Sequence, residues 1–390
     1  MVGLKSVPQT EKGTERWRRQ ELSDEHVARA WCVAHCQRQH SPQVAPRPNP
    51  VSLSAHSHQD PVHVKTLAIV MSAALLAAVA SLEAQGSQSP ADEQNMRVIL
   101  LGTQGGPTFN AQRLGISTLV LAGSERLLFD AGRGTTMGMA RAGINPADVT
   151  KVFLTHLHSD HVISLPELIV FPWAQTRTVP LYVWGPSGTR SMMQKFQEAL
   201  AFDIHVRRDV DEKIPGEGVR VISTDITEGV VYESGGVTVT AFLVDHGPVK
   251  PAYGYRVDYR GHSVVLSGDT RPSDNLVKFA TGVDVLIHEI GRYKQDPLLV
   301  GPPDELVPNT RQTRRRAITI AEHHTDGDEV GEVLARTKPK LAVFSHYNSD
   351  PQSTLPLVRK HYAGPVEFGE DSMIIVIGQT IEVRRRAAAP

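Results

Sequence analysis

The chain of 390 residues is poor in cysteine: it has only two, Cys32 and Cys36, and both lie near the N-terminus. One pair of cysteines without a second pair is a weak signal for a structural metal site. The remaining sequence has no cysteine, which suits an oxidising compartment. The hydrophobic content of 40% is sufficient for a large core.

No apolar run after the N-terminal region reaches the length of a membrane-spanning helix. The apolar run that follows Lys65 falls short of the roughly 18–20 residues that a span requires. A positive residue, a short apolar core and the small residues Ala78 and Ala80 describe a secretory signal peptide instead. We therefore expect a signal peptide over 64–84, cleaved after Ala80 or Ala84, and a periplasmic or secreted protein with no stable membrane span.

The first 63 residues have low apolar density, which predicts disorder. Since a signal peptide belongs at an N-terminus, residues 1–63 are either a disordered extension or sequence upstream of the true start, at Val62 or Val64. The competing interpretation is a real extension that is followed by an internal hydrophobic anchor. Residues 85–95 are the predicted linker, and 96–386 the predicted catalytic domain.

An excess of positive charge is also lacking. The first 80 residues hold nine of the 41 basic and six of the 42 acidic residues, so 32 basic and 36 acidic residues follow, a formal charge of −4. Because nucleic-acid binding depends on cations that contact phosphates, this balance predicts a small-molecule ester substrate and no nucleic-acid partner. Arg207-Arg208 and Arg314-Arg315-Arg316 are local basic runs, and acidic residues follow the first closely.

The densest group of chemically active residues is the segment 156–161, His-Leu-His-Ser-Asp-His, which follows the apolar run 151–154. Loops at the carboxyl ends of strands usually carry the chemistry of α/β folds. Imidazole and carboxylate together suit Zn²⁺ and similar divalent ions. The alternation lets His156 and His158 reach one ion while Asp160 and His161 reach a second.

Three further candidates follow apolar runs in the same way. His246 comes after the alternating run 237–242, Asp269 after 263–267, and His346 after 341–344. Strand ends that converge on one rim would bring these side chains to the first cluster. The predicted metal ligands are His156, His158, Asp160, His161, His246, Asp269 and His346.

With these motifs, and with the segments 99–103 and 127–132, the chain resembles the metallo-β-lactamase superfamily, in its ribonuclease Z and arylsulfatase-like branch. The resemblance covers roughly residues 96–383 and implies an α/β fold, the four-layer αββα sandwich. It also implies two metal sites that share a bridging Asp269. The first site would use His156, His158 and His246, and the second Asp160, His161 and His346. The implied cofactor is two divalent ions, Zn²⁺ by preference, with Mn²⁺ or Fe²⁺ compatible.

Two divalent ions about 3.5–4 Å apart can share a hydroxide and clamp the oxygens of an ester, so we predict a metal-dependent hydrolase of ester bonds. The predicted catalytic residues are Asp160 and His324. Ribonuclease Z enzymes carry a His-Ser-Thr motif whose histidine acts near the leaving group, and an ungapped alignment puts His324 on that histidine. A slip of one residue would select His323 instead.

We accordingly predict a secreted enzyme that cleaves a small phosphate or sulfate ester through the shared hydroxide. One alternative is a lactone or carboxyl-ester hydrolase of the same fold. The other is a tRNA 3′-processing endonuclease like ribonuclease Z. A β-lactamase is disfavoured, because those enzymes generally lack the bridging residue that Asp269 supplies. The resemblance is also compatible with a homodimer.

Overall fold

The computed structural model describes residues 94–108, 110–291 and 310–385, all within a compact unit that begins at Leu82. The predicted segment 1–63, the predicted signal peptide 64–84 and nearly all of the predicted linker lie outside the described residues. Within the described part of the chain, no helix has both the length and the apolar character that crossing a membrane requires.

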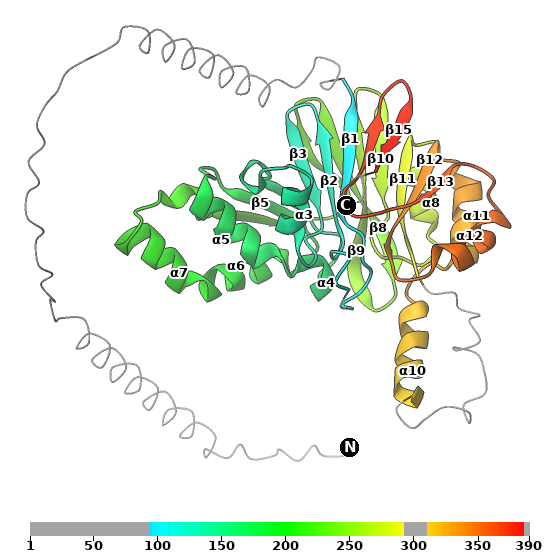
Figure 1. Cartoon of the computed structure of the whole chain (residues 1–390), viewed down its shortest axis with the longest axis horizontal. Helices are drawn as coiled ribbons and strands as arrows, with labels where there is room; N and C mark the ends of the chain where they lie inside the picture. The colour runs from blue at the N-terminus through cyan, green and yellow to red at the C-terminus, as the bar shows by residue number, and fades with distance from the viewer. Residues whose placement is uncertain (1–93, 109, 292–309, 386–390) are drawn as a thin grey trace, which may run out of the picture. The chain divides into compact units, whose positions relative to one another are not determined.

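Two β-sheets form the centre of the unit (Figure 1). The first has eight strands in the order β15-β14-β1-β2-β3-β4-β5-β6, and the second has seven in the order β13-β12-β11-β10-β9-β8-β7. The strands of the first sheet are β1 (Met96–Gly102), β2 (Ser117–Ala122), β3 (Glu125–Phe129), β4 (Lys151–Phe153), β5 (Leu181–Gly185), β6 (Val221–Asp225), β14 (Met373–Ile377) and β15 (Ile381–Arg384). The strands of the second are β7 (Gly229–Ser234), β8 (Val237–His246), β9 (Val249–Tyr259), β10 (His262–Leu266), β11 (Val285–Ile290), β12 (Leu341–Tyr347) and β13 (Val366–Phe368).

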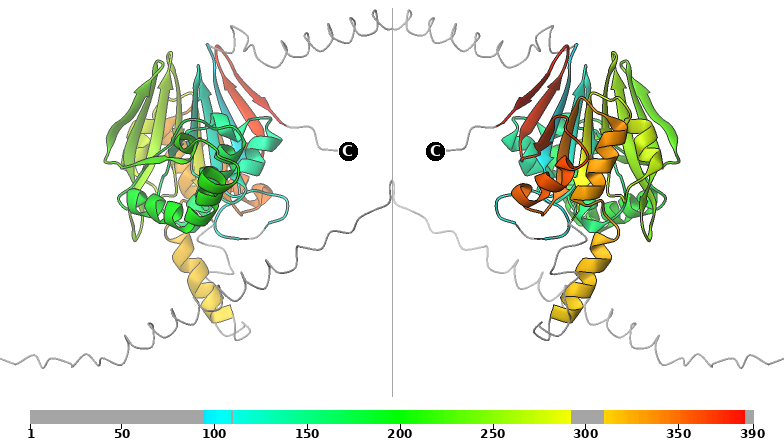
Figure 2. Two further views of the ribbon diagram at one scale, coloured as in Figure 1. Left: turned by 90° about the vertical axis from the view of Figure 1, so that its left-hand side faces the viewer. Right: turned by 90° about the vertical axis from the view of Figure 1, so that its right-hand side faces the viewer.

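Helices cover the outer face of each sheet, as Figure 2 shows from both sides. Those on the first sheet are α3 (Thr135–Arg141), α4 (Ser159–Val162), α5 (Leu165–Gln175), α6 (Thr189–Ala199) and α7 (Ala201–His205). Those of the second half are α8 (Asp274–Ala280), α10 (Thr310–Ala321), α11 (Gly327–Thr337) and α12 (Pro351–Arg359). The predicted four-layer αββα sandwich is therefore confirmed.

Strand β1 shows why apolar runs form the inner layers. Val98 and Leu100 face the core between the two sheets, whereas Ile99 and Leu101 face the helices of the first half. All four side chains are buried, and burying each contributes about 1.5–3 kcal/mol. A strand that is buried on both faces is uniformly apolar instead of alternating, as the sequence Val-Ile-Leu-Leu is.

The strand directions bring the site together at one edge. Strands β10, β11 and β12 are parallel, and β8 runs in their direction because two antiparallel pairings separate it from β10. Their carboxyl ends therefore lie at the same edge of the second sheet. The loop after β4 reaches this edge from the first sheet, and Tyr253 and Tyr255 of β9 hold it there. The Tyr255 hydroxyl donates to the Leu154 carbonyl (2.7 Å), and the Tyr253 amide donates to the Thr155 carbonyl (2.9 Å).

Candidate metal centre

All seven predicted ligands lie together where the two sheets meet. The loop after β4 and the short helix α4 supply four of them, and the others come from the ends of β8, β10 and β12. They form two groups in which the potential ligand atoms lie within 4.8 Å of one another. The grouping is the one that the resemblance implied, with Asp269 in contact with both sets.

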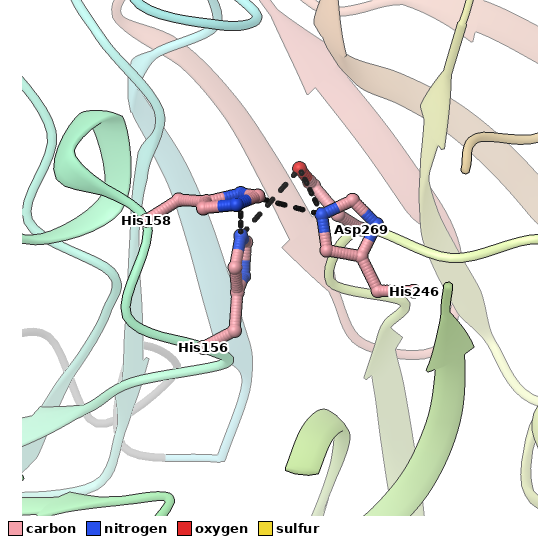
Figure 3. Close-up of side chains that lie close together, drawn as sticks. All are labelled: His156, His158, His246 and Asp269. Carbon is pink, nitrogen blue, oxygen red and sulfur yellow. Dashed lines mark hydrogen bonds and ion pairs between the residues drawn. The ribbon is translucent and has the colours of Figure 1, made fainter. Parts of the chain in front are cut away.

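The first group contains His156, His158, His246 and Asp269, and Figure 3 shows the three rings and the carboxylate pointing toward a common centre. The Nδ1 atom of His158 lies 3.0 Å from His156 Nε2 and 3.3 Å from His246 Nε2. Asp269 Oδ2 lies 3.8 Å from Nε2 of both His156 and His246. His158 is exposed, whereas the other three residues are buried, so the site opens to solvent on the His158 side.

The second group contains Asp160, His161 and His346. His346 Nε2 lies 3.3 Å from both Asp160 Oδ2 and His161 Nε2. Despite burial, which acts in the opposite direction, His346 and His161 lower the pKa of Asp160 to about 2. Asp160 is therefore a carboxylate at neutral pH, as a metal ligand must be.

Asp269 lies between the two groups. Its Oδ2 is 3.4 Å from His161 Nε2, in addition to its contacts with the first group, and its Oδ1 is 3.2 Å from His346 Nδ1. Burial raises the pKa of Asp269, but His346 and His161 outweigh this and lower it well below its usual value. An ionised carboxylate at this position can contact an ion in either group.

Three of the histidines are oriented through their second ring nitrogen. Thr155 Oγ1 lies 3.0 Å from His156 Nδ1, Asp130 Oδ2 lies 2.8 Å from His161 Nδ1, and the His323 carbonyl lies 3.1 Å from His246 Nδ1. Such partners fix the ring so that Nε2 faces the centre, as they do in metal sites generally. Asp130 lies in the segment 127–132, which contributes to the family resemblance, but no role was predicted for it.

The residues fit divalent metal ions. In a tetrahedral site with Zn–N bonds of about 2.0–2.1 Å, ligand nitrogens lie roughly 3.3 Å apart, close to the 3.0–3.3 Å found around His158. Burial lowers the pKa of His156 and of His246, which favours the neutral imidazole that binds metal. Asp269 Oδ1 and His346 Nδ1 lie 3.2 Å apart, but neither has a hydrogen bond, and buried polar atoms are rarely left so.

His161 is the exception among the rings. Burial lowers the pKa of His161, but Asp269 and Asp130 more than offset this and raise it well above its usual value. A metal ion must displace that proton, so we expect metal binding at this group to release a proton.

Next to the second group, His324 is paired with a buried carboxylate. Its Nδ1 lies 3.0 Å from Glu289 Oε1, which also accepts from the backbone amides of Thr270 and Thr325 at 3.2 Å. Although burial lowers the pKa of His324, Glu289 raises it to about 9. The sequence analysis missed Glu289, whose signal was an acidic residue two positions after the apolar run 285–287.

The neighbouring ring of His323 lies elsewhere. It is 6.2 Å from the ring of His246, against 5.0 Å for His324. Burial and Arg271 lower the pKa of His323, so it favours the neutral form. Of the two histidines left open by the alignment, the geometry favours His324 as a proton donor.

A cleft of about 580 Å³ opens beside this pair. His324 and His346 line it, and so do Gly105 and Gly106. Ala317 and Ile320 of α10 line it together with residues around the start of α12. Any group that enters this cleft therefore meets His324 next to the candidate metal ligands.

Comparison with known proteins identifies the family of the chain. The sequence profile of the family described as "Beta-lactamase superfamily domain" matches residues 125–347, more than half of the chain. The chain belongs to the metallo-β-lactamase superfamily. It is a metal-dependent hydrolase of ester bonds.

Relatives of this superfamily member include the ribonuclease Z of Mycobacterium avium strain 104. The two are 34% identical over 288 residues, which cover 71% of this chain and 96% of the relative. Among solved structures, the metallo-β-lactamase fold protein YhfI from Bacillus subtilis is 18% identical with a TM-score of 0.56. Human tRNase Z, short form, is 21% identical with a TM-score of 0.52. Each alignment covers 72% of this chain and 99% of the other, and these two likenesses concern the fold alone.

The comparison overturns one prediction, that of a small-molecule ester partner and no nucleic-acid partner. A relative this similar over nearly its whole length is named for cleaving RNA. The prediction failed because the formal charge of −4 averages over the entire surface. Binding to phosphates requires cations only along the path of the strand, and Arg314-Arg315-Arg316 lies in α10, which leads to His324.

Proposed function

We propose that this enzyme is a dinuclear-metal phosphodiesterase that cleaves RNA, as a ribonuclease Z-like tRNA 3′-processing endonuclease. The proposal replaces the predicted hydrolysis of small phosphate or sulfate esters. The observation that carries it is the 34% identity over 96% of the Mycobacterium avium ribonuclease Z. The seven clustered ligands and the adjacent pair of His324 and Glu289 support it.

We assign two Zn²⁺ ions to the site, with Mn²⁺ or Fe²⁺ as compatible substitutes. Bound there, divalent ions supply an activated water and stabilise the negative charge that develops on the phosphoryl oxygens. His156, His158 and His246 would hold one ion, and Asp160, His161 and His346 the other. Asp269 lies between the groups and keeps them in register, while Asp130 orients the ring of His161.

His324 provides the proton that the leaving oxygen needs. Glu289 accepts from its Nδ1 side, so the proton available for transfer is on Nε2. When the phosphorus–oxygen bond breaks, the electron pair stays on the leaving oxygen, and His324 transfers its proton to that atom. His324 also lines the cleft, so the leaving-group part of the RNA occupies the cleft.

The test compares substrates on the full chain after loading with Zn²⁺ or Mn²⁺. A tRNA precursor with a 3′ extension should be cut at one position, and a chelator should stop the reaction. Bis-nitrophenyl phosphate should be hydrolysed as a simple diester, and Asp269→Ala serves as the inactive control. Release of nitrophenol from nitrophenyl sulfate, with the precursor left intact, would contradict the proposal.

Location is a separate proposal. A tRNA precursor is met only in the compartment where RNA is made, whereas the predicted signal peptide over 64–84 would direct export. Cell fractionation and N-terminal sequencing of the purified protein would decide whether the protein stays in the compartment where RNA is made or is exported. A mature N-terminus near Gln85 in an exported fraction would exclude tRNA precursors as the natural substrate.

A further inference from the structure

His346 is held in the second group differently from the other buried ligand rings. Thr155, Asp130 and the carbonyl of His323 contact the Nδ1 atoms of those rings, whereas Nδ1 of His346 has no hydrogen bond. The φ angle of His346 is +51°, a left-handed conformation that is uncommon for residues other than glycine. Such a conformation persists only where the surrounding structure determines it. The position of the ring therefore depends on what holds the backbone on either side of it.

The backbone after His346 is held by Arg113, a half-buried residue between β1 and β2. Its Nη1 donates to the carbonyl of Tyr347 (2.9 Å), and its guanidinium lies over the Tyr347 ring, 4.0 Å from the centroid. The same guanidinium donates through Nη2 to the carbonyl of Thr103 (2.6 Å), and through Nε and Nη2 to its hydroxyl (3.1 and 3.0 Å). Thr103 directly follows β1, and its carbonyl also accepts from the Tyr347 amide (3.3 Å). One planar group therefore joins the end of β12 to the end of β1 beside His346.

Asp371, between β13 and β14, holds Thr103 from the other side. Its Oδ1 accepts from the amide and the hydroxyl of Thr103 (3.0 and 2.8 Å), and its Oδ2 accepts from the Leu114 amide (2.6 Å). The Thr103 hydroxyl thus accepts from Arg113 and donates to Asp371, which fixes its orientation. Since Thr103 is also completely buried, Arg113 is attached to a fixed point of the first sheet.

The segment that carries Arg113 also reaches the other side of His346. The Gly106 amide lies 3.2 Å from His346 Nε2. A β-carbon on Gly105 would lie 2.8 Å from the His346 carbonyl oxygen, which is too close for a residue with a side chain. Both glycines line the cleft. A displacement of this segment would therefore move the lining of the cleft together with the ring of His346.

We propose that Arg113 is a positioning residue that holds His346 in place as a ligand of the second group. It acts through the backbone, because its contact is with Tyr347, the residue that follows the ligand. Arginine suits this task, since its rigid fork of donors can bond two carbonyls at once. The inference rests on the ion that the proposed function assigns to the second group, and it adds a residue on which the affinity for that ion depends.

The sign of the expected effect separates positioning from charge. Removing a positive charge near a divalent ion should by itself strengthen metal binding, because like charges repel. Arg113→Gln removes the charge and the fork of donors together. Charge alone therefore predicts tighter binding in this variant, whereas loss of position predicts weaker binding. Removing a residue that orients a metal ligand typically lowers metal affinity roughly 10- to 100-fold.

The experiment titrates the metal-free full chain with Zn²⁺ against a chromophoric chelator, which gives the number of ions bound and the dissociation constant of each. Each group is examined by itself in a variant that lacks a ligand of the other group. In the His158→Ala background, which impairs the first group, Arg113→Gln should weaken binding of the remaining ion roughly 10- to 100-fold. In the Asp160→Ala background, which impairs the second group, Arg113→Gln should leave the remaining affinity unchanged.

The matched control is Arg256→Gln. Arg256 likewise pairs with a carboxylate, that of Asp258, and donates to a backbone carbonyl, that of Phe279. It lies on β9, which supplies none of the seven ligands, so the control should leave both affinities unchanged. Should Arg113→Gln fail to fold, Thr103→Val tests the same contact: it removes the hydroxyl that accepts from Arg113, keeps a similar size, and should weaken the second group alone.

Unchanged or tighter binding by the second group, or an equal loss in both groups, would overturn the inference. Binding of a single ion by the unaltered chain would instead overturn the dinuclear centre of the proposed function. The titration involves no RNA, so its outcome is independent of which ester the enzyme cleaves.

Discussion

Replacing His324 with alanine tests the chemistry of the site most directly. The ring is held by Glu289 at 3.0 Å, and its pKa of about 9 keeps it protonated at neutral pH. The same ring also forms a group with Asp269 and His346 in which the potential ligand atoms lie within 4.8 Å. A proton donor and a metal ligand are thus the two roles that the geometry allows.

The two roles predict different results. A general acid typically contributes about 10²- to 10⁴-fold, which corresponds to about 2.7–5.4 kcal/mol of transition-state stabilisation. His324→Ala should therefore reduce kcat for RNA by that factor, because a sugar oxygen leaves poorly without a proton. Hydrolysis of bis-nitrophenyl phosphate should fall by less than tenfold, because nitrophenolate is a stable anion.

The assay pairs these rates with the metal content of the purified variant, measured by elemental analysis. We expect the variant to hold as many ions per chain as the unaltered protein. His323→Ala is the matched control and should have a much smaller effect on RNA cleavage, since its ring lies outside the pair with Glu289. Loss of metal from His324→Ala, or an equal loss of rate on both substrates, would refute the role of His324 as the acid.

Three further predictions follow from the same contacts. Asp269→Ala should abolish turnover and lower the metal content, because both groups lose a ligand; an active variant with two ions would contradict the bridging position. Glu289→Gln should lower the pH at which RNA cleavage is lost on the alkaline side. The reason is that Glu289 raises the pKa of His324, and the protonated ring is the active form. An unchanged pH profile would contradict the pairing of His324 with Glu289. Glu125→Gln should reduce the free energy of unfolding by about 1–3 kcal/mol near pH 7, because Glu125 is buried 2.7 Å from Lys151. Burial raises the pKa of Glu125, but the hydrogen bond and charge of Lys151 outweigh this and lower it. The contribution is therefore complete above the unfolded pKa of about 4.3 and is lost as pH falls through the lower folded pKa. Urea denaturation should find a smaller difference between the two proteins at pH 3 than at pH 7.

The ligands could be predicted because each directly follows an apolar run. His246, Asp269 and His346 are far apart in sequence, yet the directions of β8, β10 and β12 bring their ends to one edge. That convergence is a general property of parallel strands, so local patterns were enough. The same holds for the sandwich, whose inner strands are apolar on both faces.

The residues that support the ligands could not be found in this way. Asp130 reaches His161 from 31 positions earlier, and Glu289 reaches His324 from 35 positions earlier. Neither pair has a sequence spacing that identifies it, since both contacts depend on tertiary packing. The choice between His323 and His324 required the position of Glu289, and no sequence pattern could reveal that α10 lines the cleft beside His324.

The contact between Tyr255 and Leu154 has a consequence for how the enzyme tolerates mutation. Four of the ligands follow strand β4 of the first sheet, and three lie at the ends of strands of the second sheet. The hydrogen bond from Tyr255 to Leu154 helps to fix the loop after β4 to strand β9 of the second sheet. Tyr255 also packs against Phe129 and Phe153 between the sheets, with ring centroids 5.4 and 5.9 Å apart. A small slip of one sheet past the other would change every distance across the centre, and a misplacement of about 1 Å can cost 100-fold in rate. The turnover rate should therefore respond to small changes in the packing between the sheets. Substitutions in this aromatic cluster should impair activity before they unfold the protein.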